Sequence, residues 1–479
     1  MSPRAGLPLV HSLELSRPLA PLRALAGMPH AFLLHSALPD ERPEAARRAR
    51  WSFFGADPFA VFRDGEASEA IGTWRSVAAR APHAPGEIAP GVSFTGGAVG
   101  YWAYDYARRL ERVPEFARDD LGLPDFVMGL YDVIGAYDHD TQQTWLFSSG
   151  LPLEGEAAML RAAERLAQFR ARLLGPGRAP LAFERGVEPP PVRGTFTEGA
   201  WRDAVRAVQE HIRRGDIFQA NLAQRWLVEL PDATLLAPAL YESLAQVSPA
   251  PYAAFLDLGD HALLCASPER FLERRGERVE TRPIKGTRPR GRTPQEDERL
   301  AAELLASAKD RAENVMIVDV LRNDLGRVCD PGTVTATGVC ELERFPQVMH
   351  LTSTVTGKLR AGVDAFDLLH ACFPGGSITG APKLRAMEVI ESLEPVRRHA
   401  YTGAIGWVGW DGDADWNVAI RTATATATGI AFHAGGGITA DSDPEAEYRE
   451  TLDKAEGLRR ALGNVIGEFT LRPGVGAGT

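Results

Sequence analysis

A hairpin signal near the middle of the chain constrains the fold more than any other stretch. The segment ALLCASPERFLERRGERVETRPIKGT holds two runs typical of β-strands, joined by the dipeptide GE at 276–277. Glycine in a short loop between such runs predicts an antiparallel hairpin. With GE as the loop, Arg275 faces Arg278. Counting outward then places Glu269 within one residue of facing Lys285, at about 5–8 Å.

An acid beside a lysine suits nucleophilic catalysis. Lysine is normally protonated, and it becomes a nucleophile when burial lowers its pKa and a nearby carboxylate can move the proton. Lys285 is therefore a candidate nucleophile with Glu269 as its acid–base partner. Gly286 and Thr287 would add a backbone amide and a hydroxyl to the same pocket. The alternative is a surface salt bridge, which contributes about 0–1 kcal/mol.

Two predicted helices each carry a pair of acids three residues apart, which places both acids on one helix face. The pairs are Asp310 with Glu313, and Glu447 with Glu450 in a helix that Asp443 is expected to cap. Such pairs could bind Mg²⁺, which takes one or two direct carboxylates and keeps several waters. No histidine or cysteine lies near them in the sequence, which argues against zinc. The alternative is that these acids are solvated helix surfaces.

Two further features remain open from the residues alone. The run Gly435–Gly437 lies between a strand-like segment and the last helix, where a glycine-rich turn could offer its amides to an anion. His350 lies in an apolar-flanked strand, where a histidine is usually a satisfied core group.

The bulk composition excludes several classes of protein. The chain has 479 residues and a formal net charge of −10, which argues against a partner made of nucleic acid or anionic membrane. No apolar run is long enough for a membrane span, and the first residues do not resemble a signal peptide. The four cysteines are scattered, as is typical of free thiols in a reducing compartment. We therefore expect a cytoplasmic protein.

The hydrophobic pattern suggests two regions. Residues 1–174 mix short strands with helices and end in a predicted helix over Gly155–Leu174, and residues 175–194 form a Pro- and Gly-rich linker. Residues 195–465 then combine strands with long helices, the first of them capped by Thr197, and a tail follows at 466–479. This mixture predicts an α+β fold.

Several motifs, in order and spacing, resemble the chorismate-utilising enzymes, the family that includes anthranilate synthase component I and aminodeoxychorismate synthase component I. They are DIFQANLAQRW, ASPERF, PIKGTRPRG, KDRAENVMIVDVLRNDLGR, FPGGSITGAPKLRAMEVI, YTGAIGW, NVAIRTA and AGGGITADSDPEAEYRETLDKA, with GGAVGYWAYDYARRLE and DLGLPDFVMGLYD in the N-terminal half. The resemblance implies antiparallel β-sheets packed as a sandwich and flanked by helices, with the N-terminal half built against it.

The resemblance also implies a substrate and a site. Chorismate carries a ring carboxylate and an enolpyruvyl carboxylate, and Mg²⁺ would bind the ring carboxylate. Glu313 and Glu450 would be direct ligands, with Asp310 and Glu447 in the outer shell, and His350 matches the family's active-site histidine. The substrate would be bound by Gly286, Thr287, Ser377, Thr379, Tyr401, Arg421, Gly435, Gly436 and Gly437.

Lys285 separates two branches of that family. Anthranilate synthases typically carry alanine in this motif, whereas this chain has PIKGT, as is typical of aminodeoxychorismate synthases. The resemblance implies that Lys285 attacks C2 of the ring while Glu269 protonates the leaving C4 hydroxyl, and that ammonia then adds at C4. The product would be 4-amino-4-deoxychorismate. Gln219 stands where isochorismate and salicylate synthases carry a lysine that activates water, which makes water an unlikely nucleophile.

The resemblance implies partners as well. The sequence shows no amidotransferase signature, so we expect ammonia from a separate glutamine amidotransferase subunit. The N-terminal half resembles the part of the family that binds tryptophan, with Ser36, Pro251 and Tyr252 as candidate contacts and His35 where an acid is usual. The alternatives are anthranilate synthase component I and, in another class, a non-catalytic regulator that binds chorismate or tryptophan. A nucleotide-binding module is disfavoured because no Walker or GxGxxG pattern occurs.

Overall fold

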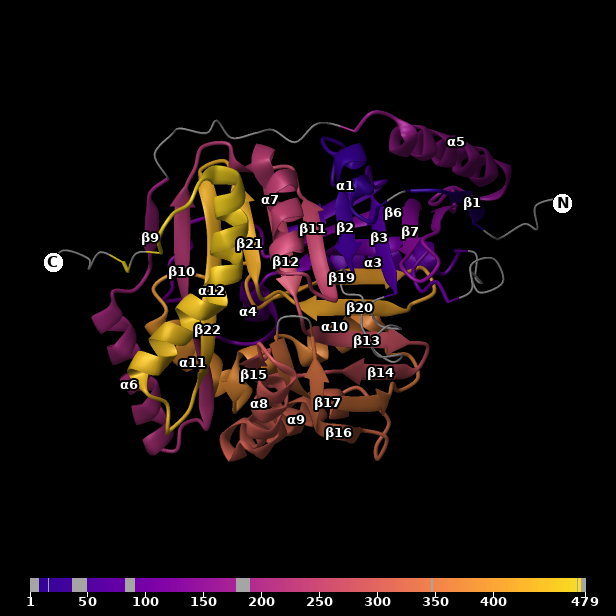
Figure 1. Ribbon diagram of the computed structural model, residues 1–479. Coiled ribbons are helices and arrows are strands. Elements are labelled where there is room, and N and C mark those ends of the chain that lie inside the picture. Colours follow the sequence, from indigo (N-terminus) through magenta and orange to yellow (C-terminus); the bar gives the residue numbers. More distant parts are fainter. Residues whose placement is uncertain are drawn as a thin grey trace.

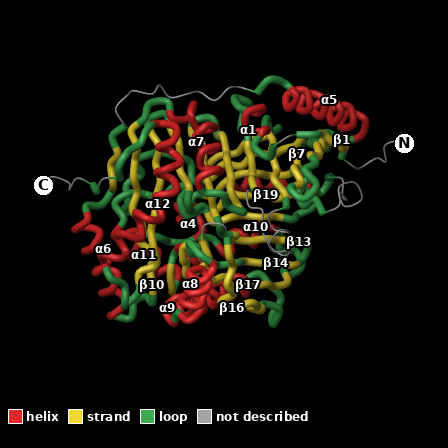
Figure 2. The backbone as a smooth tube through the Cα atoms, viewed as in Figure 1, coloured by secondary structure: helices red, strands yellow, loops and turns green. Residues whose placement is uncertain are grey.

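Two large antiparallel β-sheets form the centre of the molecule (Figures 1 and 2). The computed structural model describes residues 8–15, 17–36, 50–81, 91–177, 190–345, 348–471 and 473–474. Within these ranges, helices and strands alternate irregularly along the chain. The predicted α+β class is therefore confirmed.

The first sheet has 12 strands among the described residues, and all its pairings are antiparallel. Its order is β1 (Leu9–Leu13), β8 (Thr144–Ser148), β7 (Val133–Asp138), β3 (Trp51–Gly55), β2 (Phe32–His35), β11 (Tyr252–Asp257), β12 (His261–Ser267), β21 (Thr422–Thr426), β22 (Gly429–Ile438), β10 (Gln219–Glu229) and β18 (Gly380–Ala381), with β9 (Val192–Gly194) beside β10.

The second sheet has 10 described strands and is also antiparallel throughout. Its order is β15 (Ile284–Pro289), β17 (Val348–Lys358), β14 (Arg278–Thr281), β13 (Arg270–Arg275), β20 (Ala414–Val418), β19 (Ala404–Gly409), β5 (Gly97–Trp102), β6 (Phe126–Tyr131) and β4 (Ala60–Arg63), with β16 (Thr335–Arg344) beside β17. In Figure 1 its strands run crosswise to those of the first sheet.

Both sheets join the two regions expected from the sequence. Strand β2 pairs with β11 in the first sheet, and β5 pairs with β19 in the second, so N-terminal strands are built into each. Most of the expected linker, residues 178–189, lies outside the described ranges, as do residues 472 and 475–479 of the tail. The boundaries at 174 and 195 stay predictions.

Helices cover the outer faces of both sheets. They are α1 (Ala20–Leu25), α3 (Ala67–Ala78), α4 (Ala107–Leu110), α5 (Gly155–Leu174), α6 (Glu198–Arg213), α7 (Ala233–Val247), α8 (Pro294–Ala306), α9 (Ala308–Gly326), α10 (Ala365–Cys372), α11 (Lys383–Leu393) and α12 (Pro444–Ile466). In Figure 1, α7 and α12 lie side by side over the first sheet. None of the helices in the described ranges combines the length and the apolar character that crossing a bilayer demands.

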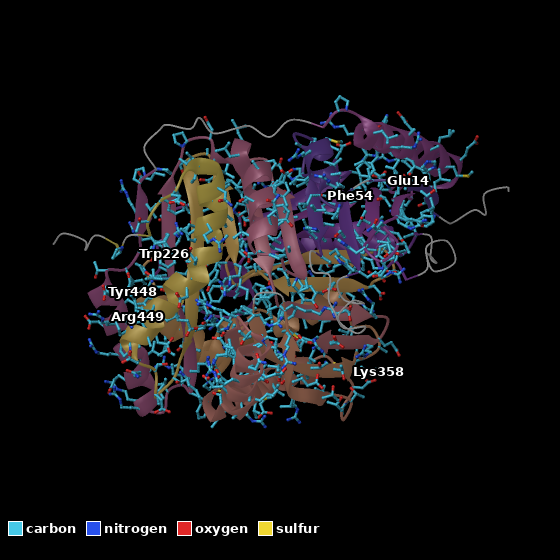
Figure 3. The ribbon with its side chains drawn as sticks, in the orientation of Figure 1. Glu14, Phe54, Trp226, Lys358, Tyr448 and Arg449 are labelled. Carbon is cyan, nitrogen blue, oxygen red and sulfur yellow. The ribbon has the colours of Figure 1, made fainter. Side chains whose placement is uncertain are left out.

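The apolar core lies in layers that match this arrangement. Phe53 of the first sheet and Trp407 of the second belong to one buried cluster between the sheets. A second cluster lies under α7 and α12 and includes Phe54 and Trp226, both labelled in Figure 3. A third joins the second sheet to α3, α9 and α10. Because apolar side chains fill the space between two antiparallel sheets and helices flank them, the predicted sandwich is confirmed.

Helix ends follow the local signals in the sequence. The side chains of Thr197, Thr293 and Asp443 each accept a hydrogen bond from a backbone N–H three residues further on. These caps start α6, α8 and α12, and each contributes about 1 kcal/mol. The positions expected for the caps of α6 and α12 are confirmed, and α5 spans the predicted Gly155–Leu174.

The predicted hairpin forms only near its turn. Arg275 faces Arg278 as expected. Further along, Pro283 has no N–H to donate to a ladder, and β15, which carries Lys285, pairs with β17 instead of β13. The expected register that placed Glu269 opposite this strand is therefore wrong, although the two side chains still meet in one cavity.

Candidate active site

A cavity of about 630 Å³ lies between residues of both sheets and of α9 and α12. It gathers the side chains that the sequence singled out from strands and helices far apart in the chain. Those lining it are Glu269, Lys285, Gly286, Thr287, Asp310, Glu313, His350, Ser377, Tyr401, Arg421, Gly435, Gly437, Glu447 and Glu450. Of the residues predicted for the chorismate site, Thr379 and Gly436 do not line it. The hydroxyl of Thr379 instead donates to the carbonyl oxygen of Gly375, 3.0 Å away.

Lys285 lines this cavity and lies beside an acid. Its Nζ is 2.8 Å from Oε1 of Glu313, so its nearest acid is one of the predicted metal ligands. Glu269 also lines the cavity, and burial raises its pKa from 4.5 to about 7, against the opposing effects of the Ser377 hydroxyl and the Lys285 charge. A carboxyl with this pKa can carry a proton near neutral pH and release it, as an acid catalyst must.

The backbone beside Lys285 fits tightly against α9. Gly286 has a φ of +81°, a conformation that favours glycine. A Cβ atom there would come within 2.9 Å of Cβ of Asp310. Glycine at this position therefore allows β15 to approach the helix that carries the first acid pair, which a larger residue would push away.

The four predicted metal acids line one cavity, two from α9 and two from α12. Each has a partner: Lys285 for Glu313, Lys454 at 2.6 Å for Glu450, Arg288 at 3.1 Å for Asp310, and the hydroxyl of Ser442 at 2.7 Å for Glu447. In the described part of the chain, no three acidic, histidine or cysteine side chains converge closely enough to make a ready-formed metal site.

The donor set nevertheless fits a hard divalent cation. It consists of carboxylate oxygens, and the charges of Glu313 and Glu450 act on each other across the cavity. Burial opposes ionisation of both, yet the charges of Lys285 and Lys454 keep the pKa of each below its ordinary value. The two lysine ammonium groups thus offset the negative charge of these acids, and a bound metal ion could do the same.

The glycine run differs from the prediction of a turn. Gly435 and Gly437 lie inside strand β22 and pair with Ala223 and Asn221 of β10. A Cβ on Gly437 would overlap the side-chain nitrogen of Gln219 and come within 2.7 Å of Oε1 of Glu313. The prediction that these glycines form a turn whose amides bind an anion is therefore wrong. Glycine is needed at these positions because a side chain there would project into neighbouring atoms of the cavity wall.

Aromatic and cationic groups also line the cavity. Arg421 is partly buried, desolvation lowers the pKa of its guanidinium, and this group donates a hydrogen bond to the carbonyl oxygen of Lys454. Nδ1 of His350 lies 2.8 Å from the hydroxyl of Thr287. Burial, followed by the charge of Arg421, lowers the pKa of His350 to about 4. His350 is therefore a neutral hydrogen-bonding group beside Lys285, and it is not a core residue remote from the site.

The structure adds residues that the sequence reasoning missed. Lys454 and Lys309 line the cavity, and Lys454 donates from Nζ to the carbonyl oxygen of Gly435 at 2.8 Å. Its spacing of four residues from Glu450 on one helix face was a readable signal. Asn221 and His433 also line the cavity, and only the pairing of β10 with β22 reveals that they share a face.

A second cavity, of about 390 Å³, contains the candidate tryptophan contacts. Ser36, Pro251 and Tyr252 all line it, and the hydroxyl of Ser36 donates to the carbonyl oxygen of Pro251 at 3.0 Å. The guanidinium of Arg270 lies 5.1 Å from the centre of the Tyr252 ring. His35 lines the same cavity, and burial lowers its pKa to about 3. This cavity can hold a small aromatic molecule against neutral and charged groups.

Comparisons with known proteins agree with this arrangement. The family model described as chorismate binding enzyme matches residues 39–460. Aminodeoxychorismate synthase component 1 of Bacillus subtilis is 38% identical over 440 residues, which cover 88% of this chain and 90% of that protein. Anthranilate synthase component 1 of Thermus thermophilus is 41% identical over 450 residues, with 92% and 94% covered.

A solved structure shows the same fold. Anthranilate synthase component I from Streptococcus pneumoniae superposes with a TM-score of 0.73 at 29% identity, covering 88% of this chain and 93% of the other. The family match extends over most of the chain and includes every residue that lines the larger cavity. This chain belongs to the chorismate binding enzymes.

Proposed function

We propose that this protein converts chorismate and ammonia to 4-amino-4-deoxychorismate, an intermediate on the route to 4-aminobenzoate and folate. The observation that carries the proposal is Lys285 in one cavity with Glu269, close enough for the lysine charge to act on the acid. Relatives named aminodeoxychorismate synthase component 1 support it. The words "component 1" in their names imply a second component, which we propose is a glutamine amidotransferase subunit that supplies the ammonia.

The first half of the reaction uses Lys285 and Glu269. The Lys285 ammonium first loses a proton to solvent, and the resulting free amine attacks C2 of the ring. The ring double bonds shift, and the C4–O bond breaks. Glu269 gives its proton to the departing oxygen, which leaves as water. A secondary ammonium then joins Lys285 to C2, and Glu269 is ionised. The raised pKa of Glu269 supports this role because the acid begins the step protonated near neutral pH.

The second half restores the enzyme. Ammonia forms a bond to C4, the double bonds shift back, and the C2–N bond breaks, so that Lys285 leaves as a free amine. The new ammonium group at C4 loses a proton, and Glu269 takes one up. The balance is chorismate plus ammonia giving 4-amino-4-deoxychorismate plus water. The covalent step divides one displacement into two, which is the usual advantage of nucleophilic catalysis.

We propose Mg²⁺ as the cofactor, with Glu313 and Glu450 as direct ligands and Asp310 and Glu447 in the outer shell. When bound, the ion neutralises the ring carboxylate of chorismate and withdraws electrons from the ring. Within the chain, Gln219 donates from its side-chain nitrogen to Oε1 of Glu313 at 2.7 Å and so orients that carboxylate. A glutamine at this position has no basic group with which to activate water.

The remaining side chains of the cavity would orient the substrate. We propose that Arg421 and Tyr401 bind the enolpyruvyl carboxylate, because they are a cation and a phenol that line the cavity and lie near each other. Thr287 and the amide of Gly286 would lie near the ring, with His350 hydrogen-bonded to Thr287. Ser377, Gly435 and Gly437 would complete the walls. For the second cavity, we propose tryptophan as a ligand of Ser36, Pro251 and Tyr252.

The decisive experiment is Lys285→Ala assayed with chorismate, ammonium and Mg²⁺. Formation of 4-amino-4-deoxychorismate should fall by at least about 100-fold because the covalent step is lost. Lys358→Ala is the control, since that lysine is half exposed on β17. Undiminished output of the Lys285 variant would eliminate the covalent mechanism, and absence of ammonia-dependent turnover in the native chain would eliminate the function.

The second candidate is anthranilate synthase component I, which the 41% identical Thermus relative favours. Product identification separates the two. Anthranilate forms directly with release of pyruvate, whereas 4-amino-4-deoxychorismate yields 4-aminobenzoate only after a lyase is added. The lysine at 285 favours the first candidate, and residual turnover in Lys285→Ala could shift toward anthranilate.

A further inference from the structure

His433 lines the larger cavity. It lies on β22, is buried, and its ring stacks on Tyr401 with the ring centres 4.9 Å apart and the planes at 9°. The backbone of Arg397 hydrogen-bonds to the ring. Nε2 has no hydrogen-bond partner among the residues that the structure describes. A buried polar atom without a partner costs about 1–3 kcal/mol, so a cavity-lining one indicates a ligand.

The chemistry of this nitrogen limits what it can bind. Burial, followed by the positive charge of Arg225, lowers the pKa of His433 well below its usual range, so the imidazole stays neutral. The single ring N–H of the neutral imidazole donates its hydrogen bond to the backbone carbonyl of Arg397, which leaves Nε2 with a lone pair. A lone pair repels the carboxylates of the substrate and needs an N–H or O–H donor. In the proposed reaction Glu269 interacts with the C4 hydroxyl of chorismate. The remaining hydrogen-bond donor that the reaction requires is ammonia.

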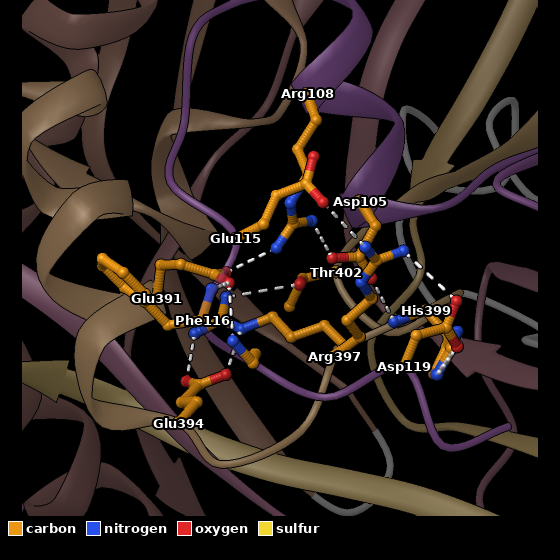
Figure 4. A network of polar contacts seen from close by, with 12 residues as sticks. Asp105, Arg108, Glu115, Phe116, Asp119, Glu391, Glu394, Arg397, His399 and Thr402 are labelled. Atoms are coloured by element: carbon orange, nitrogen blue, oxygen red, sulfur yellow. Dashed lines mark hydrogen bonds and ion pairs between the residues drawn. The ribbon is translucent and has the colours of Figure 1, made fainter. Parts of the chain in front are cut away.

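Two polar side chains, Arg225 and His399, lie close enough to His433 for their charges to act on its ring, and Figure 4 shows His399 beside Asp119. Nε2 of His399 lies 3.7 Å from Oδ1 of Asp119, whose side chain is 34% exposed, and Arg225 pairs with Asp120. In the described ranges, neither ring nitrogen of His399 nor Nε of Arg225 has a hydrogen-bond partner. Clusters of such atoms usually hold small polar molecules such as water. Ammonia has the same size and can donate the same hydrogen bonds.

We propose that Nε2 of His433 accepts a hydrogen bond from the incoming ammonia and holds it for attack on the ring. This inference rests on the proposed function, because it names the binding site of its second substrate. Binding by an acceptor keeps the ammonia lone pair free for C4, since the nitrogen donates an N–H to His433 and its own lone pair points away. The stack on Tyr401 fixes the imidazole beside the substrate.

The test uses two variants of the full chain with Mg²⁺, chorismate and ammonium chloride as the probe. His433→Phe keeps a ring to stack on Tyr401 and removes the nitrogen. The KM for ammonium should rise about tenfold, the loss expected for one hydrogen bond, while the KM for chorismate stays within about twofold. His433→Gln retains a side-chain acceptor and should recover part of the loss.

Each outcome decides the matter. An unchanged KM for ammonium in His433→Phe would overturn the assignment and leave the ring as a support for Tyr401 alone. An equal rise in both KM values, or loss of chorismate binding by calorimetry, would also overturn it, because the nitrogen would then serve the substrate or the fold. If the native chain makes anthranilate, the proposed function fails but the ammonium effect should persist. If the native chain uses no ammonia, both proposals fall.

Discussion

Glu269→Gln should abolish turnover and yet stabilise the folded chain at alkaline pH. Burial raises the pKa of this carboxyl from 4.5 to about 7, so the folded state binds the proton more tightly than the unfolded state does. Its stabilising contribution is fully present below pH 4.5 and is lost as the pH rises through about 7. At about 1.36 kcal/mol per pKa unit, the ionised carboxylate destabilises the fold at pH 8 by about 3 kcal/mol.

Glutamine removes this penalty because it cannot ionise. By thermal unfolding of the ligand-free chain at pH 8, Glu269→Gln should melt about 3 °C above the native protein, and the difference should shrink to about 1 °C at pH 5. Glu69→Gln, a change at an exposed glutamate on α3, should leave both melting temperatures unchanged. A gap of the same size at both pH values would refute the reasoning, since titration could not produce it. Native turnover should also decline above about pH 7 as the acid loses its proton.

Three further changes test the surroundings of the site. Gly437→Ala should sharply reduce turnover because its Cβ would come within 2.7 Å of Oε1 of Glu313, whereas Gly199→Ala, with open space around it on α6, should leave turnover unchanged. Arg398→Met should lower the free energy of unfolding, measured by chemical denaturation, by about 3–5 kcal/mol, because it leaves Glu394, its buried ion-pair partner at 2.6 Å, without a counter-charge. A second change, Glu394→Gln, should restore much of that loss. Glu450→Gln should weaken Mg²⁺ binding measured by calorimetry about tenfold or more, and an unchanged affinity would remove this acid from the metal site.

Local chemistry explains what the sequence could predict. The caps at Thr197 and Asp443, the turn that pairs Arg275 with Arg278, and the acid pairs on one helix face depend on residues within a few positions of one another. Such signals need no knowledge of the rest of the chain. They were enough to identify Lys285 and the acids as candidates before any fold was known.

Long-range pairing explains what the sequence could not predict. The proximity of Lys285 to Glu313 depends on β15 lying against α9, which the turn residues between them do not encode. The register predicted from the hairpin is wrong beyond Pro283. Proline has no N–H with which to continue the pairing, and β15 pairs with β17 instead. Gly435 and Gly437 read as a turn because glycine is rare inside strands, and only the pairing of β22 with β10 shows why side chains are excluded there.

The two cavities meet at one peptide bond, which makes their coupling testable. Glu269 lines the larger cavity, while Arg270, the next residue, lines the smaller one and lies over Tyr252. Arg270 also pairs with Asp415 at 3.0 Å, and the pairing of β13 is irregular just beyond it. Successive side chains in an extended strand point to opposite sides, so a ligand that moves the backbone at Arg270 also changes the direction of the Glu269 side chain.

L-tryptophan should therefore bind in the smaller cavity, as measured by calorimetry, and change turnover at saturation. Its main effect should fall on the rate rather than on the KM for chorismate, because Glu269 serves the chemical step. Tyr252→Ala should remove binding and the rate effect together. Saturating tryptophan that leaves the rate unchanged would show that the smaller cavity is uncoupled from the acid, and that the shared peptide bond is rigid enough to isolate the two sites.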